Sequence, residues 1–275
     1  MTDKKTYPSA FGGLPSQETL HTGRAIFTEA YAFLPASTMS DIVTSNLPHW
    51  NDTRLWVLAR PLSGFAETFS LYLMEVAPGG GSKAPEPDEQ AEGVIFVTAG
   101  SAELTLKGKT HQISAGSYIY LAAGDEWQLS NSDAEDLVFY WFRKRYQAAD
   151  GIEKPASFVS HDDNVEPIPM PDTQGKWATS RFVDSDDVRH DMHVNIVTFQ
   201  PGGVIPFEET HVMEHGIAVL QGKAVYKLNT DWVEVEAGDF MWLRAFCPQA
   251  CYAAGSEPFR YLLYKDVNRH PDLQL

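Results

Sequence analysis

An internal duplication constrains the fold of this chain more than any other feature of its sequence. The tripeptide Pro-Gly-Gly at 78–80 recurs at 201–203, and the stretch 105–124 matches 227–246 with a glycine at the same place in each. The offset between matching residues drifts by only two positions along the repeat, so few insertions separate the halves. Self-similarity over this length indicates two copies of one structural unit, and it predicts two domains.

Each half consists of short apolar or alternating runs that end at Gly, Pro, Asn or Asp, while amphipathic helical periodicity is scarce. Such runs at regular spacing are typical of strands in a sandwich or barrel. The sequence therefore predicts an all-β fold. The expected strands are 69–76, 93–100, 101–108, 117–124 and 136–146 in the first half, and 194–203, 216–222, 223–229, 239–246 and 260–266 in the second.

The extent of the repeat sets the expected domain boundaries. Residues 147–189 are rich in Pro, Asp and Gly and are expected to form an exposed, irregular linker. The first 60 residues lie outside the repeat, and any strands they form are expected to pair with the other half. The expected units are an extension over 1–60, a first barrel over 61–146, a linker over 147–189 and a second barrel over 190–275.

The composition of the chain argues against several classes of partner. The formal net charge is −16 over 275 residues, and an acidic surface repels nucleic acid and anionic membranes. No window approaches the roughly 20 apolar residues that span a bilayer, and the first residues lack the apolar core of a secretory signal. Cytoplasmic localisation is the simplest expectation, with Cys247 and Cys251 as buried apolar residues and not a disulfide.

The stretch PFEETHVMEHG at 206–216 contains a cluster of acids and imidazoles. If this stretch is extended around Glu209 and His211, alternation places both side chains on one face, and a following turn can return His215 to that face. Gln249, from a distant strand, is the candidate fourth donor. Two imidazoles, one carboxylate and one amide suit Mn, Fe, Co, Ni or Zn, so the second repeat is expected to hold a divalent metal.

The first repeat provides an internal control, because it has no imidazole at the corresponding positions. It is therefore expected to be a structural barrel whose metal ligands are lost. Spacing alone matches Glu86, Asp88 and Glu92 with Glu209, His211 and His215, Trp127 with Gln249, Tyr140 with Tyr261, and Lys144 with Lys265.

Three further polar residues have less specific signals. Glu208 is expected to be solvated, while Glu214 is either solvated or a partner of a ligand imidazole. His193 shares a strand face with Asn195, and a packed or surface role is favoured for it.

The spacing of glycines and candidate ligands resembles the two motifs of the cupin family, with substitutions at the ligands. Glu209 stands where the first His is usual, His215 where the Glu is usual, and Gln249 where the last His is usual. The resemblance covers roughly 60–146 and 190–266. It implies a bicupin, that is, two jelly-roll barrels of the double-stranded β-helix type.

The second half is similar to one cupin group in particular, the (S)-ureidoglycine aminohydrolases of purine and allantoin breakdown, also called glyoxylate-induced proteins. The similar runs are ETHVMEHG at 209–216, LQGKAVYKLNTDW at 220–232, GDF at 238–240, Gln249, and RYLLYKDVNR at 260–269.

This resemblance implies a single Mn ion in the second barrel and hydrolytic release of ammonia from ureidoglycine to leave ureidoglycolate. It also implies that Glu209 and Lys265 take part in catalysis, although the lysine matched to Lys265 in the first repeat leaves a structural role open. Bicupins often assemble further, so a homo-oligomer is expected. The alternatives are another metal-dependent bicupin enzyme, such as a decarboxylase or dioxygenase on a small carboxylate, and a non-catalytic ligand-binding cupin. The implied metal ligands are Glu209, His211, His215 and Gln249, and the implied substrate contacts are Tyr226, Tyr261 and Lys265.

Overall fold

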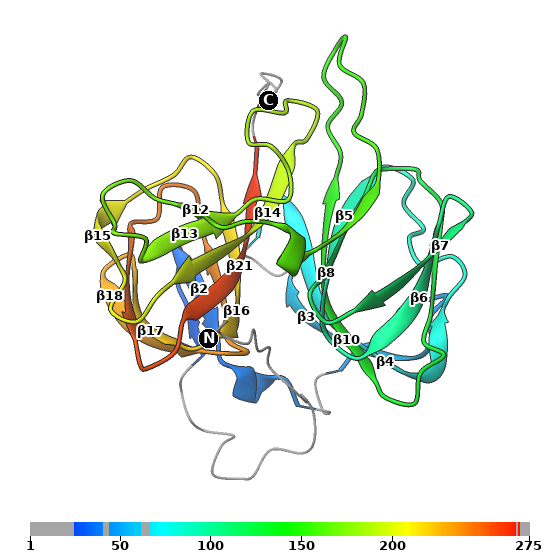
Figure 1. The fold of residues 1–275 in the computed structure, drawn as a ribbon, viewed down its shortest axis with the longest axis horizontal. Coiled ribbons are helices and arrows are strands. Elements are labelled where there is room, and N and C mark those ends of the chain that lie inside the picture. The colour runs from blue at the N-terminus through cyan, green and yellow to red at the C-terminus, as the bar shows by residue number, and fades with distance from the viewer. Residues whose placement is uncertain (1–24, 41–43, 62–65, 268, 270–275) are drawn as a thin grey trace.

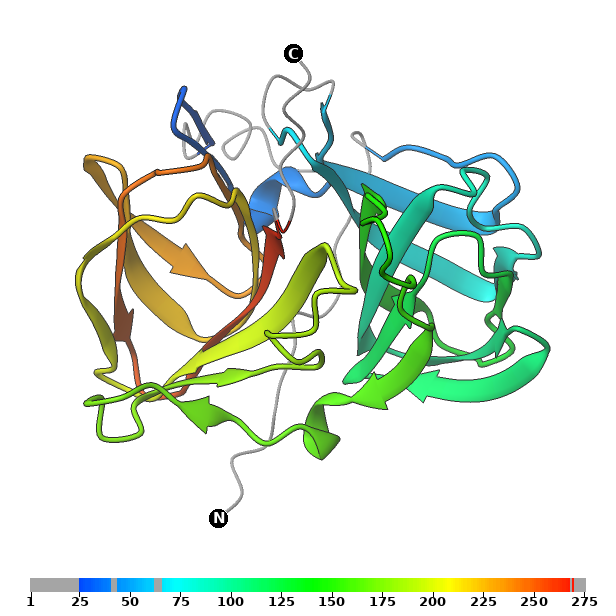
Figure 2. The ribbon, with the colours of Figure 1, turned by 90° about the horizontal axis from the view of Figure 1, so that it is seen from above.

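The computed structural model describes residues 25–40, 44–61, 66–267 and 269. The amino-terminal stretch on which the absence of a secretory signal rests lies outside these residues. Two β-barrels lie side by side and account for nearly all of the regular structure (Figures 1 and 2). Within the described residues, no helix is long and apolar enough to cross a membrane. The expectation of an all-β chain with two barrels is confirmed.

The N-terminal barrel is one sheet in the order β11-β8-β5-β10-β4-β9-β6-β7, in which β11 covers Phe158–His161 and β3 pairs with β4. Its interior is filled by apolar side chains that include Trp50, Trp127 and Trp141. All five strands expected in this half are present. The strands are β3 (Asn51–Ala59), β4 (Phe69–Ser82), β5 (Ala91–Ala99), β6 (Ser101–Leu106), β7 (Lys109–Ser114), β8 (Ser117–Leu121), β9 (Trp127–Ser130) and β10 (Leu137–Arg145).

The C-terminal barrel has two facing sheets, one containing β19-β16-β21-β14 and the other β15-β20-β17-β18. Its inner face carries an apolar cluster that includes Tyr226, Tyr261 and the buried free thiols of Cys247 and Cys251. The five strands expected here are also present. The strands are β14 (Met192–Phe199), β15 (Val204–Glu209), β16 (His215–Gln221), β17 (Lys223–Leu228), β18 (Asp231–Glu236), β19 (Phe240–Leu243), β20 (Gln249–Ala254) and β21 (Phe259–Asp266).

Segments outside the repeat add strands to both barrels. β2 (Tyr31–Leu34), which pairs with β1 (Ile26–Phe27), joins the C-terminal barrel beside β19. The expected pairing of the extension with the other half therefore holds for β2, whereas β3, which also lies in the first 60 residues, pairs with β4 of the N-terminal barrel. The region 147–189 differs from the irregular linker that was expected: β11 (Phe158–His161) pairs with β8 of the N-terminal barrel, and β13 (Trp177–Ser180) pairs with β12 (Ile168–Pro169) and β14. Two short 3-10 helices, Ala36–Thr38 and Asp162–Asn164, also lie within the described residues.

A continuous apolar core joins the two barrels. The faces of β5 and β10 that point out of the N-terminal barrel meet the outward faces of β16 and β21. Phe69 stacks on Tyr264 with ring centroids 3.9 Å apart. Along each of these strands, successive side chains alternate between this interface and the interior of a barrel. Two residues next to each other in the sequence therefore contact different parts of the molecule.

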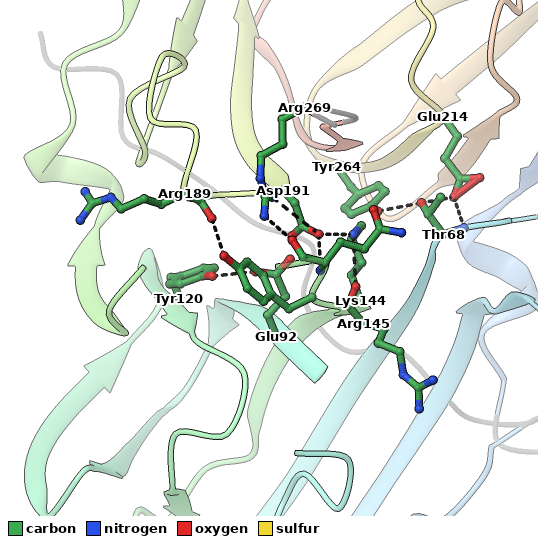
Figure 3. Close-up of polar contacts among 12 residues, drawn as sticks. Thr68, Glu92, Tyr120, Lys144, Arg145, Arg189, Asp191, Glu214, Tyr264 and Arg269 are labelled. Carbon is green, nitrogen blue, oxygen red and sulfur yellow. Dashed lines mark hydrogen bonds and ion pairs between the residues drawn. The ribbon is translucent and has the colours of Figure 1, made fainter. Parts of the chain in front are cut away.

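Polar contacts extend this interface (Figure 3). Lys144 of β10 donates to Asp191, with Nζ and Oδ2 2.6 Å apart, and Tyr120 donates to Glu92, with Oη and Oε2 2.6 Å apart. Burial and the neighbouring Asp191 raise the pKa of Glu92 well above its usual range. These surroundings therefore favour the neutral form of Glu92 beside Asp191, at the boundary between the barrels.

The pairing register gives the residue equivalence of the two barrels. The β5–β10 ladder skips Thr98 at a bulge, and the β16–β21 ladder skips Leu220 at a bulge in the same place. Counting back from these bulges makes Gly93 the equivalent of His215. Their cross-strand partners are then equivalent as well. The equivalent pairs are Gly93 with His215, Arg143 with Lys265, and Phe139 with Tyr261.

This register corrects three matches made from spacing. Glu92, Tyr140 and Lys144 are each one residue away from the true equivalents of His215, Tyr261 and Lys265. A slip of one residue moves a side chain to the opposite face of a strand, and these three residues accordingly face the other barrel. The match of Trp127 with Gln249 is confirmed, because Trp127 pairs with Leu106 as Gln249 pairs with Leu228.

Candidate metal centre

The four expected ligands come from three neighbouring parts of the C-terminal barrel. Glu209 is the last residue of β15 and lies opposite Gln249, the first residue of β20. His211 and His215 lie on either side of the turn that leads into β16. The Glu209 Oε1 and His211 Nε2 atoms are 3.5 Å apart, and the two imidazole centroids are 5.0 Å apart. The turn thus returns His215 to the side of His211, as the spacing predicts.

The connection between β19 and β20 holds this turn in place, a contact that the spacing of the ligands in the sequence did not predict. The backbone N–H of Phe246 donates to the carbonyl of His211, with N and O 2.6 Å apart. Phe246 has a φ of 63°, a left-handed conformation that is uncommon for a bulky residue. The connection between β19 and β20 therefore fixes His211 and leads directly into Gln249.

His215 has the protonation state that a metal ligand needs. It is 4% exposed, and burial together with the nearby His211 lowers its pKa to about 3. The ring is neutral at physiological pH, and its Nδ1 lies 3.0 Å from the backbone carbonyl of Glu214. With Nδ1–H donating to that carbonyl, the lone pair of Nε2 is the one available for a metal.

The carboxylate of Glu214 does not contact an imidazole. It accepts hydrogen bonds from the backbone N–H groups of Glu67 and Thr68 and from the Thr68 hydroxyl, which also contacts Tyr264 (Figure 3). The support that Glu214 gives to His215 comes from its backbone carbonyl. Its side chain anchors the turn to the segment just before β4, so the N-terminal half of the chain holds the turn that carries the ligands. Glu208 is exposed, as expected, and forms an ion pair with Lys227.

Two tyrosines orient Gln249. The Tyr226 hydroxyl donates to Gln249 Oε1 at 2.9 Å, and the Tyr226 and Tyr261 hydroxyl oxygens are 3.5 Å apart. Burial is the main cause that raises the pKa of both phenols well above the usual value. They are therefore neutral donors, and a carbonyl oxygen with two lone pairs can accept from Tyr226 and still bind a metal.

A row of cationic and imidazole side chains crosses the inner wall of the same barrel. Lys265 of β21 lies between His215 of β16 and His193 of β14, as their Cα pairings show. Burial and then Arg181 lower the pKa of Lys265. Lys265 has no ion pair among the described residues. A half-buried lysine with a lowered pKa and without an ion pair among the described residues is typical of a functional site.

His193 is the site residue that sequence reasoning undervalued. It is 4% exposed, and its Nε2 is buried without a hydrogen-bond partner in the described structure. Burial is the main reason that its pKa falls to about 4. The alternation of His193 with Asn195 was visible in the sequence, but only the sheet shows that this face points into the barrel beside Lys265.

The donor set fits a divalent metal ion. Two imidazoles that bind one ion through nitrogens at about 2.1 Å have ring centres roughly 5 Å apart, which is the spacing of His211 and His215. Among the described residues, no three His, Cys, Asp or Glu side chains form a ready-made metal cluster. Gln249 contributes an amide oxygen in addition to those residue types, so the candidate set has four donors, from the end of β15, the turn into β16 and the start of β20.

Comparison with known proteins identifies the family. The cupin domain family matches the chain twice, over residues 72–143 and 195–264. A probable (S)-ureidoglycine aminohydrolase of Oryza sativa subsp. japonica is 33% identical over 90% of this chain and 76% of its own length. The (S)-ureidoglycine aminohydrolase of Arabidopsis thaliana is 31% identical over 90% of this chain and 79% of its own.

A solved structure is also similar to this chain, in both sequence and fold. A protein from Pseudomonas aeruginosa described as glyoxylate-induced is 59% identical and superimposes with a TM-score of 0.93, over 99% of this chain and 100% of its own. The two cupin matches cover both barrels, and the relatives cover both barrels together. The chain is therefore a bicupin that belongs to the (S)-ureidoglycine aminohydrolase family.

Proposed function

We propose that this protein is a metal-dependent (S)-ureidoglycine aminohydrolase, which releases ammonia and leaves ureidoglycolate in purine and allantoin breakdown. One observation carries the proposal. The four candidate ligands, both tyrosines and Lys265 converge on the inner face of one barrel, in a chain whose relatives are named for this reaction.

Glu209, His211, His215 and Gln249 would hold the metal, and Mn is the expected ion because the set offers nitrogen and oxygen donors without a thiolate. When bound, it would supply positive charge that orients and polarises the substrate. Burial keeps Tyr261 protonated, and its hydroxyl would donate a hydrogen bond to the ureido oxygen. Tyr226 donates its one proton to Gln249, so its oxygen would accept a hydrogen bond from a ureido N–H. Lys265 would pair with the substrate carboxylate or carry a proton.

The reaction needs a proton to move but consumes none overall. The bond from the central carbon to the amine nitrogen breaks, and a bond from that carbon to the water oxygen forms. The water loses one proton, which a carboxylate oxygen of Glu209 can accept, and the leaving amine gains one. Lys265, whose pKa is lowered by burial, would donate that proton, and transfer of the Glu209 proton to Lys265 would then restore both groups. His193, buried beside Lys265, would help to hold the substrate or relay this proton.

An ammonia-release assay tests the proposal directly. Freshly generated ureidoglycine is supplied to the enzyme as purified, after chelation, and after Mn is restored. We expect ammonia above the spontaneous rate, loss of that excess on chelation, and recovery with Mn. No ammonia above the spontaneous rate would exclude the activity, while release that survives chelation would exclude metal dependence.

A further inference from the structure

We propose that the mouth of the N-terminal barrel is a second small-molecule site, which binds a protonated amine that also carries a hydrogen-bond-accepting oxygen. A cavity of about 510 Å³ lies there, within the size range of small-molecule sites. It occupies the place in the first barrel that the candidate metal centre occupies in the second. Three of its wall residues, Gly93, Leu121 and Trp127, stand at the positions of His215, Leu243 and Gln249.

The first observation that points to a ligand is a buried donor in the cavity wall. Trp141 is 1% exposed, and its Nε1 has no hydrogen-bond partner in the described structure. A Cβ on Gly93 would lie 2.9 Å from this nitrogen, and both residues line the cavity. The indole N–H therefore faces the space that Gly93 leaves empty. Buried donors are normally satisfied, so an oxygen of a ligand is the expected partner.

The charges around the cavity select the class of ligand. The guanidinium of Arg143 donates Nε and Nη2 to Glu86 and Nη1 to the hydroxyl of Tyr72, so it has little capacity left for an anion. At the rim, Glu89 and Glu126 have no ion pair within the described part of the chain. Lys83 is the one lysine among the lining residues, and it is exposed. A cation is favoured over an anion at this rim.

Aromatic rings add to the preference for a cation. Trp127 and Trp141 both line the cavity and meet edge to face, with ring centroids 5.5 Å apart and planes at 86°. The guanidinium of Arg143 already lies 5.0 Å from the ring centroid of Trp141, so Trp127 is the ring whose face we expect to attract an ammonium group. A ligand with a protonated amine toward the acidic rim and a carbonyl oxygen toward Trp141 would satisfy both features. Glycinamide has these two groups and no carboxylate, and it is the probe we choose.

Nuclear magnetic resonance of the indole N–H groups tests this site in the full-length protein. The chain has seven tryptophans, and Trp141→Phe identifies the resonance of Trp141. We expect glycinamide to shift that resonance saturably with a dissociation constant of about 1 mM, the range that so small a ligand allows. Acetamide, which keeps the carbonyl and lacks the amine, should bind at least about tenfold more weakly.

Three variants separate this site from its alternatives. Glu89→Gln combined with Glu126→Gln should weaken glycinamide binding about fivefold, while Glu135→Gln, an exposed acid that does not line the cavity, should leave it unchanged. His211→Ala should also leave the Trp141 shift unchanged, because that residue lies in the other barrel. The site is refuted if the Trp141 resonance does not move in folded protein, or if its shift disappears in His211→Ala. Equal affinity for acetamide and glycinamide would refute the assignment to a cation.

Discussion

The mouths of the two barrels share one strand register but differ in how their charges are paired. In the N-terminal barrel, Arg143 forms an ion pair with Glu86, with Nη2 and Oε1 2.5 Å apart, and Trp127 takes the position of a metal donor. In the C-terminal barrel, the equivalent of Arg143 is Lys265, a half-buried cation without an ion pair in the described structure. A paired charge supports the fold, whereas a partly buried charge without a partner points to chemistry. The two copies therefore share the same strand pairing but carry different side chains at equivalent positions of the barrel mouth.

The largest difference between the barrels should appear when a ligand is removed. His211→Ala is expected to abolish stoichiometric metal binding and to lower kcat/KM by roughly 10³-fold or more, because the centre loses one of its two imidazoles. Its side chain is 35% exposed, so the variant should fold. Metal analysis and the ammonia assay measure both effects.

Asp88→Ala is the matched control for that variant, since Asp88 lies at the mouth of the other barrel. We expect it to retain metal and activity. Full metal occupancy in His211→Ala would contradict the ligand assignment, and loss of metal in Asp88→Ala would move the metal to the N-terminal barrel.

The equivalent cations provide the next comparison. Lys265→Met should lower kcat by about 10²-fold while metal content stays unchanged, because a proton donor or carboxylate partner is lost. Arg143→Met should leave kcat within about twofold and cost about 2 kcal/mol of stability, because Glu86 loses its partner. Steady-state kinetics and urea denaturation separate the two outcomes. Unchanged kinetic constants in Lys265→Met would remove this lysine from the mechanism.

The contact between the barrels can be weakened at one glycine. A Cβ on Gly216 would lie 2.5 Å from Cζ of Phe69, in the core that joins the barrels. Gly216→Ala is therefore expected to cost about 2 kcal/mol of unfolding free energy through overpacking. Gly93→Ala is the comparison variant, since its added carbon meets Trp141 inside the N-terminal barrel and not the interface. A neutral effect of Gly216→Ala in urea denaturation would argue against tight packing here.

The smallest effect concerns the carboxyl pair that spans the interface. Burial, and then Asp191, raise the pKa of Glu92 in the folded protein well above its unfolded value. The folded state therefore holds this proton more tightly, and the free energy of unfolding should fall as pH rises from the unfolded pKa of a glutamate, about 4.3, through the raised folded pKa. Glu92→Gln should flatten this decline in urea denaturation across that window. Equal slopes in both proteins would show that Glu92 is not held neutral.

The sequence predicted the architecture well because the signals for it are local and repeated. Glycine and proline spacing located both barrels, and alternation placed Glu209 and His211 on one side of an extended segment. Gln249 and Trp127 were matched correctly, because each begins the strand that pairs with the first strand of the equivalent β-hairpin. These features need no knowledge of which face of a strand is buried.

The exact residue equivalence between the strands of the two barrels could not be predicted from these local signals. Matching by spacing linked Lys144 to Lys265 and Glu92 to His215, and each match was one residue off. The first match joined two lysines, and the second followed from aligning Gly93 with Gly216. The bulges at Thr98 and Leu220 fix the true register. The role of β2 could not be read either, since four residues pair with a strand over 200 positions away. His193 likewise needed the sheet to show that it faces Lys265.

The location of the metal is the most direct test of this account. Crystals of the protein loaded with Mn can be measured with X-rays near the manganese absorption edge, where an anomalous peak marks the ion. We expect one peak per chain in the C-terminal barrel, within bonding distance of Glu209, His211, His215 and Gln249. A peak at the mouth of the N-terminal barrel, or one in the C-terminal barrel that these four side chains do not contact, would contradict the division of roles between the two barrels.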